Sequence, residues 1–357
     1  MHYERDNIRR MHGYAPGEQP LTGDAIKLNT NENPYPPSPA AMRALNAIEA
    51  DALRRYPSPM AAAFIAAAAH LHGVEPTQLV ATNGGDELLR LAITTFVAPG
   101  QPIGITEPSY SLYPVLANIH DSPVHAEPLG SDWSLPDDLG ERMNAAGVAL
   151  TLLVNPHAPS GHLTPAAAID TLAETLDGVL LVDEAYVDFA DPGHDVVRLT
   201  ARHDNLLILR TLSKGYSLAG LRLGYGIGAT SLIAPIATKT RDSYSVDTVA
   251  DAVGAAALAD QEHARRSWEA VRDERDRLSA ALRERGYEVP PSQANFCLAR
   301  LPATAPVTAE RLHQDLRQQG ILVRHFNTER LHDCLRISIG MAEQNDRLLQ
   351  ALDGLMR

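Results

Sequence analysis

The stretch that decides the fold is residues 206–228, which reads LLILRTLSKGYSLAGLRLGYGIG. Its apolar start predicts a buried strand that ends in a turn carrying Thr211, Ser213 and Lys214, and Arg222 follows behind small residues. Hydroxyl and guanidinium groups are suited to bind phosphate oxygens. A lysine desolvated between apolar neighbours can lose its proton and act as an amine nucleophile. The stretch therefore indicates either a phosphate-bearing carbonyl cofactor joined to Lys214 or, taken alone, a solvated Ser-Lys loop.

Other apolar runs along the chain also end in polar turns. Four more runs read as strands, at residues 79–82, 103–106, 150–154 and 179–182, and capped helices alternate with them. Such a pattern indicates an α/β fold with a mostly parallel central sheet and helices on both faces. Ligands of these sheets bind outside the carboxyl ends of the strands. We therefore expect a site at one edge, built from residues 84–86, 155–161, 183–186 and 211–214.

Two further turns carry groups suited to a flat, anionic ligand. Gly84, Gly85 and Asp86 lie between a strand and a helix, where free N–H groups form an anion cradle. A plain strand-to-helix turn explains these glycines equally well. Tyr110 follows the next strand and either stacks on a flat ring or lines the core.

Asp183 lies at the end of a buried strand and needs a partner, because an isolated buried carboxylate is very costly. A protonated pyridine nitrogen is one such partner, which makes the set suitable for pyridoxal 5'-phosphate. Lys214 would hold this cofactor as a Schiff base, and Tyr186 would bond its ring hydroxyl. Ser213, Arg222 and the turn at 84–86 would hold its phosphate.

The carboxyl-terminal part is expected to form a smaller α+β domain after a long charged helix at about 255–285. We place the large cofactor domain at 30–245, and assign 1–29 and 246–357 to an N-terminal arm and the small domain. Alternation along residues 335–339 puts Arg336 opposite three apolar residues. Arg336 and Arg324 are either charges on an outer face or forks that clamp an anion.

Composition excludes several other classes of function. The 357 residues carry a formal net charge of -13, which argues against a broad nucleic-acid footprint or attraction to an anionic membrane. The two cysteines, Cys297 and Cys334, lack CxxC spacing, so we expect no disulfide framework and no metal site. There is no apolar signal core or membrane-spanning run, and we expect a cytoplasmic protein.

Together these residues resemble the fold type I aminotransferases, with their aspartate-aminotransferase-like fold, and most of all the histidinol-phosphate aminotransferase family. The similarity runs from about Asn7 to the end of the chain. It rests on the order and spacing of Asn31-Glu-Asn-Pro34, Arg55-Tyr-Pro57, Asn83-Gly-Gly-Asp-Glu87, Asp183-Glu-Ala-Tyr186, Thr211-Leu-Ser-Lys214, Leu218-Ala-Gly-Leu-Arg-Leu-Gly224 and Leu335-Arg-Ile-Ser338.

The resemblance implies a role for each matching position. Lys214 would be the cofactor lysine and the base and acid of the proton shift, and Tyr110 the ring-stacking aromatic. Arg336 would bind a substrate carboxylate, and Arg324 the substrate phosphate. Tyr14 and Tyr56 would reach into the site of a neighbouring subunit, Tyr56 toward the cofactor phosphate. The family implies a homodimer with shared sites that acts in histidine biosynthesis on an amino donor and a 2-oxo acid.

One departure from the family pattern lies in Asn155-Pro-His-Ala-Pro-Ser-Gly161. The family usually reads Asn-Pro-Asn-Asn-Pro-Thr-Gly there, and the asparagine that bonds the ring oxygen is replaced by Ala158. A hydrogen bond to a charged group contributes roughly 1.5–3 kcal/mol. We therefore expect the lysine-bound cofactor to keep its proton to higher pH, unless His157 or a water compensates. An Ala158→Asn variant with an unshifted spectral midpoint would contradict this hypothesis.

Alternative functions remain open at this point. The run Gly224-Tyr-Gly-Ile-Gly228 is spaced GxGxG and not GxGxxG, and no capped helix follows it directly, which disfavours a nicotinamide site. A decarboxylase of the threonine-phosphate type shares the same motifs. Within the aminotransferases, a broad aromatic amino acid enzyme is the runner-up. A cofactor-free binding protein is disfavoured by Lys214 together with Asp183.

Overall fold

The computed structural model describes residues 3–19, 23–194 and 196–356. Its largest sheet has the strand order β2-β8-β7-β6-β5-β3-β4. The strands are β2 (Leu79–Thr82), β3 (Ile103–Glu107), β4 (Val124–Pro128), β5 (Leu150–Val154), β6 (Val179–Asp183), β7 (Leu206–Thr211) and β8 (Gly224–Gly228). Neighbouring strands from β7 to β4 are parallel, whereas β8 is antiparallel to both β2 and β7. The mostly parallel sheet is confirmed.

The glycine-rich run at 224–228 is a strand, β8, and not a ligand loop. A Cβ at Gly224 would lie 2.7 Å from the carbonyl carbon of Gly84, and one at Gly226 would lie 3.1 Å from Leu88. Glycine is therefore required because helix α5 and the preceding turn pack directly on this strand.

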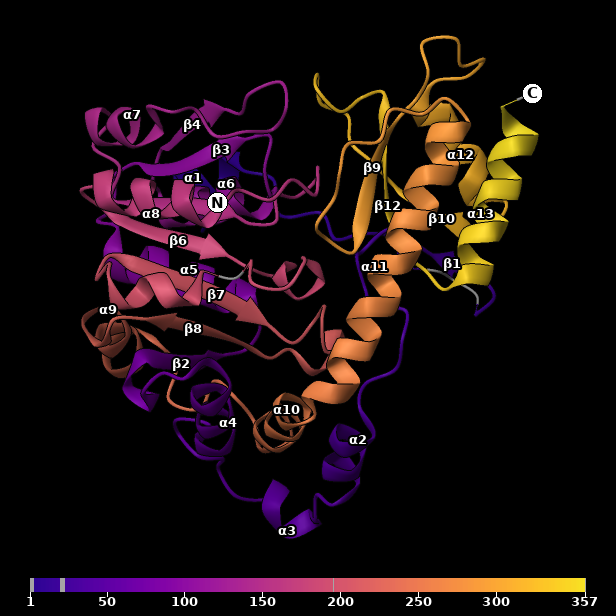
Figure 1. Cartoon of the computed structure of the whole chain (residues 1–357). Coiled ribbons are helices and arrows are strands. Elements are labelled where there is room, and N and C mark those ends of the chain that lie inside the picture. The colour runs from indigo at the N-terminus through magenta and orange to yellow at the C-terminus, as the bar shows by residue number, and fades with distance from the viewer. Residues whose placement is uncertain (1–2, 20–22, 195, 357) are drawn as a thin grey trace.

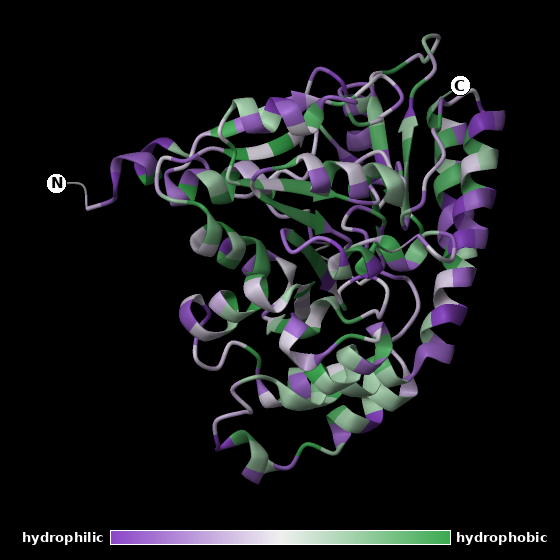
Figure 2. Cartoon of the chain, turned by 60° about the vertical axis from the view of Figure 1, so that its left-hand side comes forward, coloured by the Kyte–Doolittle hydropathy of each residue, from purple (hydrophilic) through white to green (hydrophobic). Residues whose placement is uncertain are grey.

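Helices cover both faces of the large sheet (Figure 1). Apolar residues of α4 (Ala62–His72), α7 (Leu139–Ala145), α8 (Ala166–Thr175) and α10 (Thr248–Ala259) form one core with one face. Those of α5 (Gly85–Phe96), α6 (Leu112–His120) and α9 (Thr230–Pro235) form a second core with the other. The hydrophobic strands between them stand out in Figure 2.

A smaller α+β unit is built from both ends of the chain. Strands β11 (Arg324–His325), β12 (Cys334–Ser338) and β9 (Phe296–Arg300) form an antiparallel sheet in that order. Strand β1 (Ile26–Lys27) pairs in parallel with β10 (Ile321–Leu322). Helices α12 (Ala309–Gln318) and α13 (Ala342–Leu355) share an apolar core with these strands.

The long helix expected at 255–285 is two helices, α10 and α11 (Gln261–Glu284). The break lies at Asp260, whose side chain accepts a hydrogen bond from the backbone N–H of His263 and so caps α11. Because α10 packs in the core of the large sheet, it lies on the other side of the boundary expected at 246. The division into two domains remains our prediction.

Several short helices complete the described chain. Helices α2 (Pro39–Asn46) and α3 (Ala50–Leu53) project below the large sheet in Figure 1. Helix α1 (Asp6–Arg10) lies beside α6, where Asn7 donates a hydrogen bond to the carbonyl of Asn118. Single-turn helices occupy Pro76–Gln78, Val187–Phe189, Val197–Ala201, Ala219–Leu221 and Ile236–Thr240.

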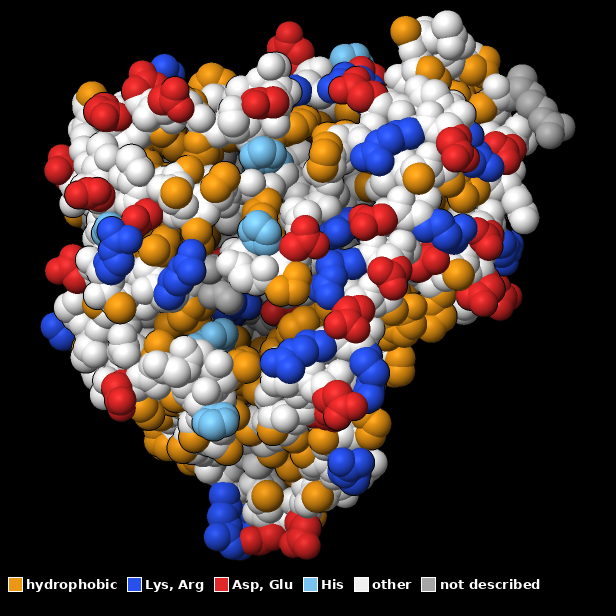
Figure 3. Space-filling model, viewed as in Figure 1, with side chains coloured by type: hydrophobic (Ala, Val, Ile, Leu, Met, Phe, Trp, Pro, Cys, Tyr) orange, Lys and Arg blue, Asp and Glu red, His pale blue; other side chains and the backbone are white. Residues whose placement is uncertain are grey.

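The visible surface mixes charges of both signs. On the face shown in Figure 3, Lys and Arg side chains alternate with Asp and Glu. Within the described ranges, no helix combines the length and apolar character needed to span a bilayer.

Candidate active site

A cavity of about 190 Å³ opens at the carboxyl ends of the parallel strands, between the large sheet and the smaller unit. It brings together most of the side chains singled out from the sequence. The predicted residues that line it are Tyr14, Gly85, Asp86, Tyr110, Asp183, Tyr186, Thr211, Ser213, Lys214, Arg222, Arg324 and Arg336. Two predicted residues, Gly84 and Tyr56, are not part of the lining.

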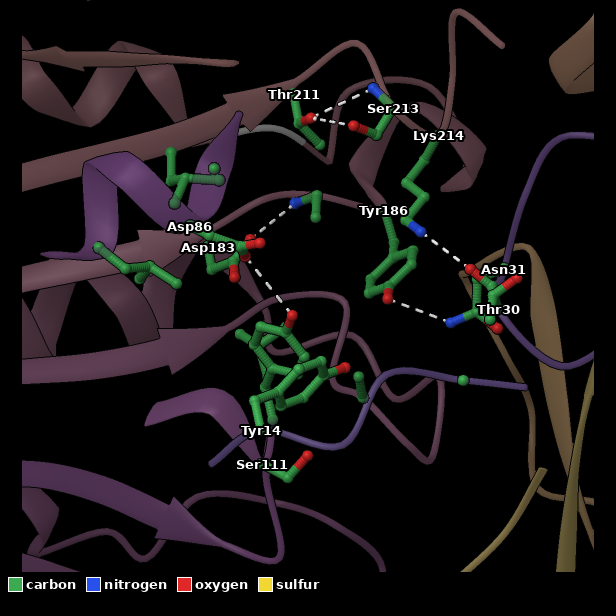
Figure 4. Close-up of a pocket in the computed structure, with 18 of the residues that line it drawn as sticks. Tyr14, Thr30, Asn31, Asp86, Ser111, Asp183, Tyr186, Thr211, Ser213 and Lys214 are labelled. Atoms are coloured by element: carbon green, nitrogen blue, oxygen red, sulfur yellow. Dashed lines mark hydrogen bonds between the residues drawn. The ribbon is translucent and has the colours of Figure 1, made fainter. Parts of the chain in front are cut away.

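Lys214 follows β7 and points across the cavity (Figure 4). Its Nζ donates a hydrogen bond to the backbone carbonyl of Thr30 at 2.9 Å. Burial, together with the nearby Arg336 guanidinium, lowers the pKa of Lys214 to about 8. Removing the proton from this amine therefore costs much less than at a solvated lysine.

Asp183 lies at the end of β6 and is 5% exposed. Its Oδ2 accepts a hydrogen bond from the Tyr113 hydroxyl at 3.1 Å, and its Oδ1 accepts one from the backbone N–H of Ala185 at 3.0 Å. Burial raises the pKa of Asp183 to about 6 despite these two donors. A cationic ligand group facing this carboxylate would restore its charge.

Tyr186 is held at the cavity by residues from both ends of the chain. Its hydroxyl accepts a hydrogen bond from Asn31 Nδ2 at 3.1 Å. Asn31 in turn accepts from the Ser338 hydroxyl through Oδ1 at 2.9 Å, and its backbone carbonyl accepts from Asn295 Nδ2 at 2.9 Å. This network ties the large sheet, the N-terminal segment and β12 together at one point.

The opposite end of the cavity is an anion cradle. Helix α5 begins at Gly85, so its first free N–H groups face the cavity beside Asp86. The Thr211 hydroxyl donates to Ser213 Oγ at 3.0 Å, and Arg222 NH1 lies 3.4 Å from the same oxygen. Two hydroxyls, a guanidinium and a helix N-terminus thus converge, as phosphate binding requires.

Gly84 shapes this cradle without lining it. Its φ of +80° falls in the left-handed region. A Cβ there would lie 2.6 Å from Arg222 NH2. The glycine therefore leaves the space in which the Arg222 guanidinium stands.

Two arginines of the smaller unit close the cavity from the other side. Arg336 NH2 donates to the carbonyl of Asn29 at 3.1 Å, while its buried Nε has no hydrogen-bond partner among the described residues. Burial lowers the pKa of Arg336. Arg324 lies with its guanidinium 5.6 Å from the Phe326 ring. The Arg336 side chain lines the cavity, and a guanidinium group there suits an anionic ligand group.

Tyrosines form one wall of the cavity. The Tyr110 ring lies edge-on to Tyr14 at 5.9 Å and to Tyr113 at 5.5 Å between centroids. Tyr14 thus lines the cavity of its own chain, and its service to a neighbouring subunit remains a prediction. Tyr56 is 81% exposed and stacks on Tyr244 at 4.5 Å, away from this cavity. Its role in a neighbouring site remains a prediction.

His157 does not take the place of the missing asparagine. Ala158 lines the cavity, but the imidazole of His157 has both nitrogens engaged elsewhere, with Ser160 Oγ and the Pro108 carbonyl. Position 158 therefore offers no side-chain hydrogen-bond donor to a ligand in the cavity. Compensation by His157, one of the two routes we considered, is excluded by this geometry.

Sequence patterns missed three residues that hold the site, namely Thr30, Asn31 and Tyr113. The motif Asn31-Glu-Asn-Pro34 marks the segment but not its contacts. Tyr113 is found three residues beyond Tyr110, and only the fold shows that Tyr113 faces Asp183.

The cavity fits pyridoxal 5'-phosphate in its chemistry. It places an amine of lowered pKa, a buried carboxyl in need of a cationic partner and a phosphate cradle around one space. Among the described residues there is no group of three or more His, Cys, Asp or Glu side chains that could hold a metal ion.

Comparisons with known proteins agree with this chemistry. The family described as "Aminotransferase class I and II" matches residues 23–352. The chain is 41% identical over 356 residues to histidinol-phosphate aminotransferase 1 of Trichormus variabilis, covering 99% of each chain. It is 41% identical over 353 residues to histidinol-phosphate aminotransferase of Synechocystis, covering 98% of this chain and 97% of the relative.

Solved structures show the same fold. Histidinol-phosphate aminotransferase from Sinorhizobium meliloti, in complex with pyridoxal-5'-phosphate, matches with a TM-score of 0.87 at 25% identity, covering 93% of this chain and 91% of that one. Thermus thermophilus aspartate aminotransferase matches with a TM-score of 0.80 at 20% identity, covering 93% and 92%. The architecture is thus that of the fold type I aminotransferases.

Proposed function

The chain belongs to the class I and II aminotransferases and, within them, to the histidinol-phosphate aminotransferases, and from this membership we propose that it transfers the amino group of histidinol phosphate to 2-oxoglutarate. The products are imidazole acetol phosphate and glutamate, and the reaction belongs to histidine biosynthesis. The observation that supports this best is the convergence of Lys214, Asp183 and the phosphate cradle on a cavity that also holds Arg324 and Arg336.

The chain's own residues supply binding and proton transfer. When bound, pyridoxal 5'-phosphate supplies a ring that draws electrons from the amine-bearing carbon of the substrate. Lys214 Nζ is positioned to take the proton from that carbon and to return it, and its lowered pKa makes both directions accessible near neutral pH. Asp183 would keep the ring nitrogen of the cofactor protonated, and the Tyr186 hydroxyl would donate a hydrogen bond to the ring oxygen.

The arginines distinguish the two ends of the substrates. The Arg336 guanidinium, which lines the cavity, binds the α-carboxylate of 2-oxoglutarate. Arg324 binds the phosphate of histidinol phosphate. The aromatic wall of Tyr14, Tyr110 and Phe326 accepts the flat imidazole ring.

A broad aromatic aminotransferase is the second candidate, because the same wall would accept the ring of phenylalanine or tyrosine. The two candidates differ in their need for Arg324, since only a phosphorylated donor has a group for it. A decarboxylase would instead release carbon dioxide.

A homodimer with shared sites and a cytoplasmic location complete the proposal. The exposed Tyr56 and Tyr244 rings support a second copy of the chain in contact with this surface. Both cysteines are free and buried, which suits a reducing compartment.

The discriminating experiment compares histidinol phosphate and phenylalanine as amino donors with 2-oxoglutarate, in the wild type and in Arg324→Ala. Loss of a charge-assisted contact of roughly 1.5–3 kcal/mol should lower kcat/KM for histidinol phosphate about 10- to 100-fold. The value for phenylalanine should change far less and serves as the internal control. Equal losses with both donors would refute the phosphate-binding role of Arg324.

A further inference from the structure

The turn at 155–161 contains a buried histidine that no step of the proposed reaction uses. His157 is 3% exposed. Its Nδ1 lies 2.7 Å from Ser160 Oγ, and its Nε2 lies 2.8 Å from the backbone carbonyl oxygen of Pro108. The imidazole therefore bridges the turn that follows β5 and the segment that follows β3.

The hydrogen-bond partners fix the protonation of this ring. Burial lowers the pKa of His157 to about 4, so the imidazole is neutral near pH 7. A carbonyl oxygen can only accept, so Nε2 carries the hydrogen and donates it to Pro108. Nδ1 then accepts the hydrogen of the Ser160 hydroxyl, whose oxygen also accepts from the backbone N–H of His162. Every polar atom of the imidazole thus has a defined partner.

The segment tied by His157 carries Tyr110, one of the aromatic residues that line the active-site cavity. Pro108 lies two residues before Tyr110, which lines the cavity, and Ala158 lines it next to His157 itself. Because β3 and β5 are neighbours in the sheet, the Nε2 bond joins the carboxyl ends of adjacent strands. A shift of the Pro108 carbonyl would therefore move the Tyr110 ring.

A brace from the smaller unit backs the imidazole. The Trp133 ring lies 5.7 Å from the His157 ring at an interplanar angle of 32°. The Arg330 guanidinium lies 3.8 Å above the Trp133 ring and donates to the carbonyls of Leu129 at 2.9 Å and Ser131 at 3.2 Å. Arg330 precedes β12, so this stack runs from the smaller unit to the turn beside the cavity.

We propose that His157 is a positioning residue of the aminotransferase, which holds the Pro108 carbonyl and hence the Tyr110 ring against the cofactor. Trp133 packs on the imidazole, and Arg330 of the smaller unit packs on Trp133. The inference rests on the proposed function, because it takes the ligand facing Tyr110 to be pyridoxal 5'-phosphate. When the hydrogen bond from His157 to Pro108 and the packing of Trp133 on His157 hold the Tyr110 ring in place, that ring keeps the cofactor in one orientation.

The substitutions His157→Gln and His157→Asn distinguish the hydrogen bond of Nε2 to Pro108 from that of Nδ1 with Ser160. The amide nitrogen of glutamine can stand where Nε2 does and donate to Pro108, whereas asparagine reaches only as far as Nδ1. We expect His157→Asn to raise the dissociation constant for pyridoxal 5'-phosphate about tenfold, the effect of one lost hydrogen bond. His157→Gln should stay within about threefold of the wild type, although Asn is the residue usual in the family.

A second measurement tests the hydrogen bond between His157 and Pro108 without cofactor binding or turnover. Hydrogen exchange of the apoprotein should quicken in a peptide covering residues 107–113 of His157→Asn and stay near the wild type in His157→Gln. A peptide covering β9 serves as the reference and should be unchanged in both variants.

The brace is tested by Arg330→Gln, with Arg311→Gln as the matched control. Arg311 is an exposed arginine paired with Asp315 on α12, remote from the cavity. We expect the Arg330 variant to quicken exchange at 107–113 and to weaken cofactor binding less than His157→Asn does. The Arg311 variant should change neither quantity.

The proposal is overturned if His157→Asn binds the cofactor with the wild-type dissociation constant. It is also overturned if the substitution lowers the melting temperature equally in the cofactor-free and cofactor-bound proteins, because a residue with a purely structural role would have that effect. If the His157 variants do not fold, the Arg330→Gln variant carries the test, and exchange at 107–113 that matches the wild type then refutes the proposal. A wild type that binds the cofactor but does not transaminate histidinol phosphate would refute the proposed function alone.

Discussion

Asp183 is buried and Lys214 is half-buried, and desolvation moves their pKa values toward each other. The amine falls to about 8 and the carboxyl rises to about 6. Each group is thereby close to losing its charge near neutral pH. Such partly ionised groups are costly to keep in a structural core, but they are useful at a site that moves protons. A single ligand that offers a carbonyl to one and a cationic nitrogen to the other satisfies both.

Lys214→Ala removes the amine without altering the cradle. We expect turnover with histidinol phosphate to fall at least about 10³-fold, because no other cavity side chain is positioned for the proton transfer. The variant should still bind pyridoxal 5'-phosphate, but reduction with borohydride should no longer fix the cofactor to the protein. Mass spectrometry after reduction measures this, and substantial remaining transamination would overturn the mechanism.

Asp183→Asn tests the raised pKa through the stability of the apoprotein. A carboxyl with a pKa of about 6 in the folded state and about 3.9 unfolded binds more protons when folded, so its contribution to stability is lost as pH rises from about 4 to 6. The variant lacks this loss. Its stability relative to the wild type should therefore grow over that range, by at most about 3 kcal/mol.

Urea unfolding at intervals between pH 4 and 7 measures that difference. Other buried groups such as His157 act in the opposite direction, but they are common to both proteins and cancel. Two parallel stability curves would show that Asp183 is already ionised in the folded apoprotein.

Single residues of the site were predictable where chemistry and spacing coincide, and less so where contacts are distant in sequence. Lys214, Asp183 and Arg222 follow from strand ends and turn composition. Asn31 holds Tyr186 and also bonds Ser338, which is 307 residues away. No local pattern shows that contact, because it arises only when β12 and the N-terminal segment meet at the cavity.

At the level of elements, the junction of β2, α5 and β8 decides whether a phosphate can be held. Gly84→Ala would place a Cβ 2.6 Å from Arg222 NH2 at a φ of +80°. We expect a stability loss of about 1–3 kcal/mol from the backbone. Displacement of Arg222 should in addition raise the dissociation constant for pyridoxal 5'-phosphate at least about tenfold.

Gly100→Ala is the matched control for this prediction. Gly100 has a φ of +82° but nothing within 4 Å of the added Cβ. Its substitution should therefore cost a similar amount of stability and leave cofactor binding unchanged. Equal cofactor affinity in both variants would show that Gly84 matters only for the backbone.

The parallel strands were predictable from the sequence because both of their faces are buried. Such strands appear as continuous apolar runs and not as an alternation of apolar and polar residues. The direction of β8 was not predictable, since its five residues alternate glycine with larger residues for close packing and resemble a loop. The break between α10 and α11 was also missed. Asp260 looks like one more charge in a charged helix until its side chain is seen to cap α11.

At the scale of the whole molecule, a surface formed by the described residues is rich in exposed apolar side chains. Apolar side chains are exposed on and around α2 and α3, the part that projects below the large sheet in Figure 1. The exposed residues there are Met42, Leu45, Leu53, Tyr56, Met60 and Tyr244. Such a group suits a contact with a second copy, as expected from the resemblance.

If Tyr56 serves the site of the other subunit, two inactive variants should restore each other. A Lys214→Ala chain has an intact Tyr56, and a Tyr56→Ala chain has an intact Lys214. In a mixed dimer, the site built around the intact lysine would receive Tyr56 from the lysine-deficient chain. Equal mixing after unfolding and refolding should therefore give roughly a quarter of the wild-type activity per chain, since half the dimers are mixed and each has one complete site.

The opposite arrangement gives a different result. If Tyr56 acts within its own chain, the only intact lysine in a mixed dimer lies beside the missing tyrosine, and mixing restores nothing beyond the activity of the Tyr56→Ala chain alone. Mixing Lys214→Ala with Asp183→Asn is the control, because both residues line the cavity of one chain and no complete site can form. Light scattering on the same samples establishes whether dimers are present, and a monomeric wild type with full activity would exclude a shared site altogether.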